Sequence, residues 1–160
     1  MKRRPAMFVL DGDIISMRSL RRRLRKSFLN TAREKKLLRL LLSAYPDRVT
    51  LRRENDASRG VMVGGRGVVL DSSSGVREGR LFLSLDPRDM PGKPEARVSL
   101  ASAIEEEWLE ELHPALVERR VLHRFEEEKD RVVSARQTLF AGLVIREEGL
   151  STRDDPEGVE

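Results

Sequence analysis

The sequence predicts an α+β protein in which two N-terminal helices precede an antiparallel β-barrel with one inserted helix. Three observations carry this prediction. Apolar residues recur at helical spacing up to Ala44. Pro46 interrupts this pattern in AYPDRVTLRR, because proline lacks an amide donor and disfavours the helical region in the preceding residue. From Val49 onwards apolar residues alternate with polar ones, as in strands.

Two helices are predicted in a basic arm, residues 1–44, over residues 15–29 and 32–44. Each has an apolar stripe, and the stripes contain Met17, Leu20, Leu24 and Phe28, then Leu37, Leu38, Leu41 and Leu42. Thr31 and Glu34 have the spacing of a capping box at the start of the second helix. If the partner of this leucine-rich arm is absent, an apolar patch is left exposed, which predicts self-association of the isolated chain.

Residues 45–148 are predicted to form one OB-like β domain, beginning with a meander. Strands are expected in RVTLRR, on both sides of the glycine turn in RGVMVGGRGVVLD, and in GRLFLSLD and EARVSLAS. Gly64, Gly65 and Gly67 are assigned to the turn, because a tight hairpin needs positive φ angles. The segments DSSSGVREG and DPRDMPGKPE are expected to be loops.

A single helix is predicted to follow the meander. Ser102 is expected to cap this helix, which continues as AIEEEWLEELHPAL and buries Trp108. Three strands then follow in ERRVLHRFEEE, DRVVSARQTLF and GLVIREE, the first two joined near Lys129 and Asp130. One helix inserted among six or seven strands is compatible with an OB-like barrel. Residues 149–160 lack a periodic apolar pattern and are expected to be a disordered tail.

Positive charge is concentrated in the first third of the chain. The 160 residues have a net charge of +4, but the segment ending at Arg53 has 16 Lys and Arg against 4 Asp and Glu, and so +12. The remainder has 15 against 23, and so −8. Dense positive charge attracts polyanions and releases their counterions on binding. Nucleic acid is therefore the first expected partner, with a merely solvated charged face as the alternative.

The sequence predicts no enzyme active site, no cofactor and no metal site. It contains no Gly-x4-Gly-Lys-Ser/Thr loop to surround a nucleotide phosphate. Consecutive glutamates in residues 105–111 point in different directions on a helix and do not form a converging pair. His113 and His123 lack a serine or aspartate at motif spacing. The absence of cysteine excludes thiolate chemistry and favours a reducing, cytoplasmic compartment.

The candidate nucleic-acid-binding residues are basic side chains on the first predicted helix, the first strand and the glycine hairpin. Guanidinium groups bind phosphates in a bidentate manner. The candidates are Arg22, Lys26, Arg48, Arg52, Arg53 and Arg66. Arg48 is equally well explained as a buried ion-pair partner. The low aromatic content argues against a series of base-stacking platforms, so backbone contacts that weaken with salt are expected.

Several segments of the sequence, taken in their order along the chain, resemble one family of proteins. LLSAYPDRVTLRR, GGRGVVLD, EARVSLASAI and DRVVSARQTLFAGLVI resemble the region after the motor in HrpB-type ATP-dependent RNA helicases of the DEAH/RHA group. The resemblance covers residues 20–147 and implies accessory helices joined at AYPDRV to an OB-like domain. The family's ATPase motor has no counterpart here, which implies a fragment, a truncated reading frame or a separate accessory subunit.

The resemblance implies a non-catalytic accessory domain that helps to bind and position RNA. The expected partners are RNA, with DNA as an alternative nucleic acid, and a helicase ATPase core in cis or in trans. The competing hypothesis is a structural module that packs on a helicase core or another chain without touching nucleic acid. A third hypothesis, binding of the basic helix to an anionic membrane, is less favoured than these two. The segments that resemble the helicase family lie outside that helix, and no lipid anchor accompanies it.

Overall fold

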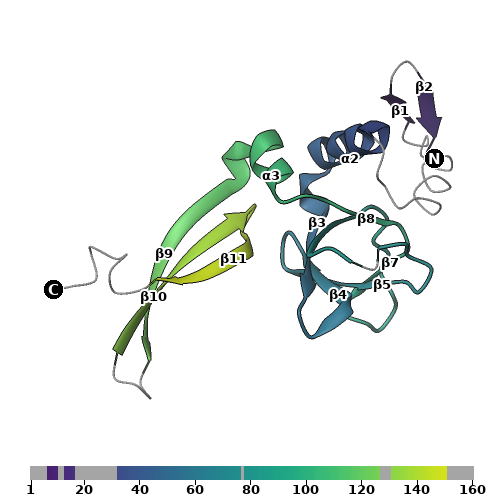
Figure 1. Cartoon of the computed structure of the whole chain (residues 1–160). Helices are drawn as coiled ribbons and strands as arrows, with labels where there is room; N and C mark the ends of the chain where they lie inside the picture. Colours follow the sequence, from purple (N-terminus) through teal and green to yellow (C-terminus); the bar gives the residue numbers. More distant parts are fainter. Residues whose placement is uncertain (1–6, 11–12, 17–31, 77, 127–130, 151–160) are drawn as a thin grey trace.

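The structure is a computed structural model that describes residues 7–10, 13–16, 32–76, 78–126 and 131–150 (Figure 1). Its main parts are a curled six-stranded sheet, a three-stranded sheet, and helices α2 and α3 near the junction of the two sheets (Figure 1). The α+β class is confirmed, and the curl of the larger sheet fits the predicted OB-like barrel. No helix within the described ranges is long and apolar enough to cross a lipid bilayer.

The N-terminal elements are a hairpin of β1 (Met7–Leu10) and β2 (Asp13–Ser16) followed by helix α2 (Ala32–Ala44). The predicted helix over residues 32–44 is therefore confirmed. The predicted start of the other helix is wrong, because residues 15 and 16 belong to β2, where β-branched isoleucines favour a strand. The rest of that helix, and Thr31 of the capping box, lie outside the described residues.

The chain changes structural type at the predicted hinge. The amide of Tyr45 donates to Leu41 O at 2.9 Å, and Pro46 then opens the short 3-10 helix η1 (Pro46–Arg48). Strand β3 (Val49–Arg53) starts immediately afterwards. Proline thus ends α2 and directs the chain into the barrel, as its missing amide requires.

The barrel sheet has the strand order β7-β5-β4-β3-β6-β8. Its remaining strands are β4 (Asp56–Met62), β5 (Arg66–Leu70), β6 (Leu81–Ser84), β7 (Ala96–Val98) and β8 (Ala101–Ala103). Gly64 and Gly65 have φ angles of 84° and 80° in the β4–β5 turn, as predicted. Gly67 instead lies within β5, where a Cβ atom would come 2.9 Å from Cγ of Glu95, so its assignment to the turn is wrong.

The segment EARVSLAS is divided between two strands rather than forming one. The carboxylate of Asp86 accepts hydrogen bonds from the backbone amides of Ser99 at 3.1 Å and Leu100 at 2.6 Å. These bonds hold the chain between β7, which runs parallel to β5, and β8, which is antiparallel to β6. Ser102 lies in β8 and is buried, so the prediction that it caps a helix is wrong.

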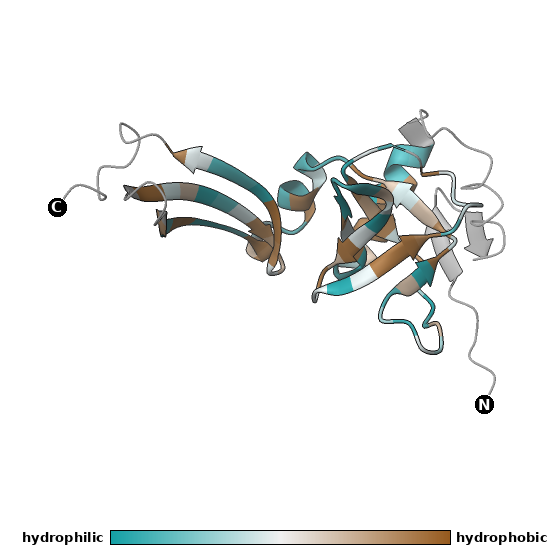
Figure 2. Ribbon diagram, turned by 90° about the horizontal axis from the view of Figure 1, so that it is seen from below, coloured by the Kyte–Doolittle hydropathy of each residue, from teal (hydrophilic) through white to brown (hydrophobic). Residues whose placement is uncertain are grey.

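The inserted helix is shorter than predicted and leads into a second sheet. Helix α3 (Glu107–Leu112) and the 3-10 helix η2 (Pro114–Leu116) precede β9 (Val117–Glu126), β10 (Arg131–Phe140) and β11 (Leu143–Leu150). These three strands have the order β11-β10-β9 and are not hydrogen-bonded to the barrel strands. Figure 2 shows the sheet extending away from the barrel, with hydrophilic and hydrophobic residues interleaved along its strands.

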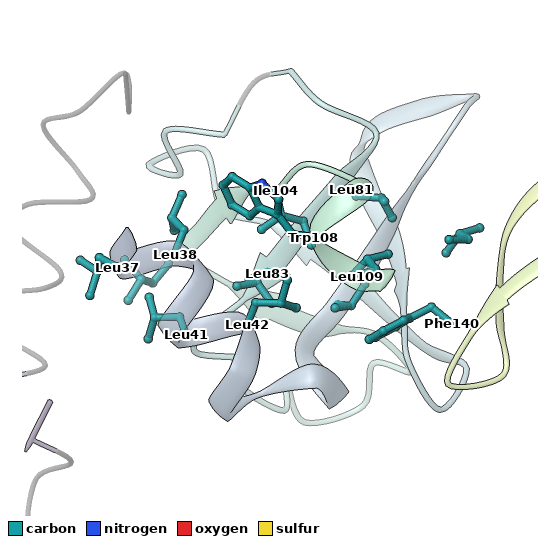
Figure 3. Packing of buried hydrophobic residues seen from close by; sticks show 13 residues of the cluster. Leu37, Leu38, Leu41, Leu42, Leu81, Leu83, Ile104, Trp108, Leu109 and Phe140 are labelled. Atoms are coloured by element: carbon teal, nitrogen blue, oxygen red, sulfur yellow. The ribbon is translucent and has the colours of Figure 1, made fainter. Parts of the chain in front are cut away.

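Two apolar clusters hold these parts together. The larger one joins α2, α3, the barrel and the base of the second sheet through Leu42, Leu83, Trp108 and Phe140, all buried (Figure 3). The predicted place of Trp108 in the core is confirmed. The smaller cluster lies inside the barrel around Val68 and Phe82. Full burial of each such large side chain contributes about 1.5–3 kcal/mol relative to exposure, so the helices are integral to the fold.

Candidate nucleic-acid interface

A groove of about 720 Å³ lies between the β3–β4 hairpin of the barrel and strand β11 of the second sheet. Five arginines and three acidic residues line it, and none of its lining side chains is aromatic. The arginines are Arg52, Arg53, Arg59, Arg80 and Arg146, and the acids are Glu54, Asp56 and Glu147. Because arginines outnumber carboxylates in its lining, this groove is the candidate site for a polyanion.

Arg52 has a structural role although it borders the groove. Its Nε donates to Gly79 O at 2.8 Å, and its other nitrogens donate to the carbonyls of Ala57, Val76 and Glu78. The guanidinium also lies 5.2 Å from the ring centroid of Phe82, and partial burial lowers its pKa. The donors that a phosphate would need are thus occupied by backbone carbonyls, which fix the loop before β6.

Arg53 and Arg59 are linked by a single carboxylate. Oxygen atoms of Glu95 lie 3.8 Å from Nη2 of Arg53 and 3.2 Å from Nη1 of Arg59. Arg59 also pairs with Asp56 at 3.2 Å, where hydrogen bonds from Ser58 and the nearby guanidinium lower the pKa of the aspartate. The pair of Arg53 is long, and both arginine side chains are about half exposed. Arg53 and Arg59 are therefore the lining residues of β3 and β4 best placed to receive a phosphate.

Arg80 and Arg146 face each other across the junction of the two sheets. Nη2 of Arg146 lies 2.9 Å from Oε1 of Glu106, and Nη2 of Arg80 pairs with Oε2 of the same carboxylate. Arg80 also donates from Nη1 to the carbonyl oxygen of Ile145 in β11. One glutamate therefore connects a residue next to β6 with a residue of the second sheet.

Arg48 and Arg66, two further predicted site residues, do not line the groove. Arg48 pairs with its neighbour Asp47 at 3.2 Å, and since neither side chain is buried, this is a surface pair and not a buried one. Arg66, at the start of β5, pairs with the exposed Asp89. Arg22 and Lys26 lie outside the described residues. Of the four predicted residues that the structure describes, only Arg52 and Arg53 line the groove.

Sequence reasoning missed Arg59, Arg80 and Arg146. Arg59 could have been found by counting outward from the glycine turn, because it lies opposite Val69 in the hairpin register. The other two come from segments 66 residues apart in the chain, and their approach depends on where the second sheet attaches. No local spacing signals such a pair.

The acidic helix does not form a catalytic or metal-binding cluster. Glu105 pairs with Lys35 at 2.8 Å, Glu110 with Arg119 at 2.7 Å, and Glu111 with Arg39 at 2.7 Å. Glu105 precedes α3, so the predicted helix does not include it, and the hydrogen bond from Arg119 lowers the pKa of Glu110. Within the described ranges, no group of three or more histidine, aspartate or glutamate side chains could hold a metal ion.

Both histidines have structural contacts. Nε2 of His113 lies 3.1 Å from Leu42 O, and its ring meets Phe140 edge-on with centroids 6.2 Å apart. His113 therefore joins α2 to the second sheet at the end of α3. Nδ1 of His123 lies 2.9 Å from Oγ of Ser134, its cross-strand neighbour in β10.

Two solved structures share this fold. The crystal structure of the E. coli DExH-box NTPase HrpB has a TM-score of 0.61 and 21% identity, over 72% of this chain and 14% of HrpB. A crystal structure of the Escherichia coli DEAH/RHA helicase HrpB has a TM-score of 0.59 and 16% identity, over 76% of this chain and 15% of the helicase. The predicted resemblance is confirmed at the level of the fold, and the chain spans about one seventh of these proteins. No family model and no curated protein matches the sequence.

Proposed function

We propose that this chain is a non-catalytic accessory domain of an ATP-dependent RNA helicase and that its groove binds the sugar-phosphate backbone of RNA. The observation that carries the proposal is the set of arginines at the junction of the two sheets. The likeness to part of HrpB supports the helicase context, with the ATPase core as the partner in cis or in trans. We expect the chain to act in the cytoplasm, with DNA as the alternative polyanion.

The lining of the groove suits phosphates better than bases. Guanidinium groups bind phosphate oxygens in a bidentate manner, whereas single-stranded bases are commonly held by stacking on aromatic rings. The groove contributes guanidinium groups and no aromatic side chain. We therefore expect binding that tolerates any sequence and weakens steeply as salt is added.

The first test is the affinity of the purified chain for labelled single-stranded and duplex RNA across a salt series. We expect micromolar binding at low salt, with log K falling linearly against log salt concentration. The variant carrying Arg53→Gln and Arg59→Gln should reduce the slope for single strands by about 1.4, which corresponds to two lost phosphate contacts. The double variant Arg48→Gln with Arg66→Gln is the matched control, because it removes the same two charges at residues outside the groove.

The outcomes separate the alternatives. If the chain fails to bind either RNA at low salt, the proposal is overturned. If the control with Arg48→Gln and Arg66→Gln loses as much affinity as the groove variant, RNA is bound elsewhere on the basic surface and the assignment of the groove is wrong.

A second candidate function, protein interaction without nucleic acid, is favoured by one surface. Phe125 of β9 and Val132 of β10 are cross-strand neighbours and are 55% and 59% exposed, with the exposed Val121 on the same face. Exposed apolar patches commonly mark protein-binding sites. The leucines of α2 that were expected to cause self-association are instead mostly buried against the barrel, with only Leu40 exposed. Light scattering of the chain and of a Phe125→Ser variant would show whether this face mediates association.

A further inference from the structure

Glu106 occupies a position that suits a phosphate group. Its two carboxylate oxygens are divided between two guanidinium groups, Oε1 with Arg146 at 2.9 Å and Oε2 with Arg80. The two arginines belong to different parts of the fold, one next to β6 of the barrel and the other in β11. A phosphate shares this geometry, because it also offers separate oxygens to two planar, fork-shaped donors.

The two arginines are accessible and belong to the groove. Their side chains are 48% and 51% exposed for Arg80 and Arg146, and both line the groove between the sheets. Arg80 also donates to Ile145 O, so a second contact directs it toward β11 without the help of Glu106. Arg146 also lines the adjoining pocket that Glu106 borders, and its Nη1 lies 3.5 Å from Oε1 of Glu148. Without the Glu106 carboxylate, these remaining contacts would still hold both guanidinium groups at the junction beside the groove.

We propose that Arg80 and Arg146 form a phosphate-binding site whose occupant in the free protein is the carboxylate of Glu106, which competes with the RNA backbone. This inference rests on the proposed function and deepens it by naming where one phosphate binds and what keeps it out. Glu106 lowers the affinity for RNA by pairing with the two arginines. A phosphate that displaces its carboxylate binds the same two guanidinium groups.

The flanking glutamates provide a matched comparison. Glu105 pairs with Lys35 of α2, and Glu107 is exposed and borders the same pocket as Glu106. Glu107→Gln therefore changes the net charge by the same amount as Glu106→Gln at an adjacent position without freeing Arg80 or Arg146. Any difference between the two variants reports the ion pairs and not the overall charge.

The experiment measures single-stranded RNA binding by fluorescence anisotropy across a salt series for the wild type, Glu106→Gln and Glu107→Gln. We expect Glu106→Gln to bind roughly tenfold more tightly than wild type at low salt and to steepen the salt slope by about 1.4, the value for two added contacts. Glu107→Gln should stay close to wild type. Adding Arg146→Gln to the Glu106→Gln variant should remove most of the gain.

A second variant keeps the charge constant. Glu106→Asp retains the carboxylate but shortens the side chain by one methylene, so it no longer reaches both arginines in the same geometry. We expect an affinity between those of the wild type and Glu106→Gln. Circular dichroism and thermal melting of each variant confirm that it is folded, and Glu106→Asp provides the test if the glutamine variant does not fold.

Each outcome bears on the inference. If the wild type binds RNA and Glu106→Gln binds with equal or lower affinity, Glu106 does not compete with phosphate and the inference is overturned, while the proposed function stands. If only Glu106→Gln binds, the competition is strong and the inference is supported. If neither protein binds RNA, both proposals fail.

Discussion

Replacing Arg52 with alanine should destabilise the fold, whereas the same change at the adjacent Arg53 should mainly weaken RNA binding. The two residues are consecutive in β3 and have the same charge, but their surroundings differ. Arg52 donates to four backbone carbonyls and lies over Phe82, whereas Arg53 has a long ion pair with Glu95 at 3.8 Å. We therefore expect a structural role at Arg52 and the proposed binding role at Arg53.

The magnitudes follow from these contacts. The hydrogen bond from Nε of Arg52 to Gly79 O, at 2.8 Å, involves a charged donor and contributes about 1.5 kcal/mol, because the group is only partly buried. Stacking of the guanidinium on Phe82 adds about 0.5 kcal/mol. We therefore expect Arg52→Ala to lower the free energy of unfolding by about 2 kcal/mol. Arg53→Ala should lower it by less than about 0.5 kcal/mol, because its ion pair is exposed and long.

Urea denaturation measures the first effect, and the denaturation slope should stay the same in both variants if the folded and unfolded states remain comparable. RNA binding is then measured under conditions where both variants are fully folded, and Arg53→Ala should show the larger loss. The reasoning is refuted if both variants have the wild-type unfolding free energy, or if folded Arg52→Ala loses more affinity than Arg53→Ala.

Four further substitutions test the fold. Leu42→Ala, at a fully buried position where α2 packs on the barrel, should cost about 2–5 kcal/mol in urea denaturation. Gly60→Ala should cost about 1–3 kcal/mol, because a Cβ atom would lie 2.7 Å from Cγ2 of Thr50, while Gly149→Ala, with open space around it, should be tolerated. Hydrogen bonds from Ser73, assisted by Arg97, lower the pKa of Asp71 to about 2. The stability that this carboxylate contributes is fully present above its pKa in the unfolded chain, about 4, and is lost as pH falls toward about 2. The melting temperature of Asp71→Asn should therefore depend less on pH in that interval than that of the wild type.

The sequence was informative where structure depends on local chemistry. Pro46 ends α2, and Gly64 and Gly65 make the hairpin turn, because each of these effects is a property of one residue type. The strands after α3 were also predicted, since alternation of apolar and polar residues is a local signal. Trp108 was placed in the core for a similar reason, as part of the apolar side of a helix.

The features that escaped prediction depend on residues distant in the chain. The division between β7 and β8 depends on Asp86, which binds amides 13 and 14 residues further on. Gly67 is required by the approach of Glu95 and not by a turn. Likewise, alternation predicts a strand but not its partner, so it did not indicate that the last three strands form a sheet of their own. The groove lies beside that sheet and was missed with it.

The charge asymmetry of the chain has a packing role in the part that the structure describes. Lys35 and Arg39 of α2 pair with Glu105 at 2.8 Å and Glu111 at 2.7 Å, and Arg39 lies 5.6 Å from the ring centroid of Trp108.

The basic and acidic segments therefore meet along α2 and α3, and part of their opposite charge is neutralised there. The net charge of the first third of the chain is for this reason a poor measure of its affinity for polyanions. The groove takes arginines from both sides of the hinge, Arg53 from the basic segment and Arg59 and Arg146 from the acidic remainder. Each of these three side chains is about half exposed and pairs with a nearby carboxylate. The affinity for RNA should thus follow the ion pairs at the junction of the two sheets more closely than the total charge of either segment.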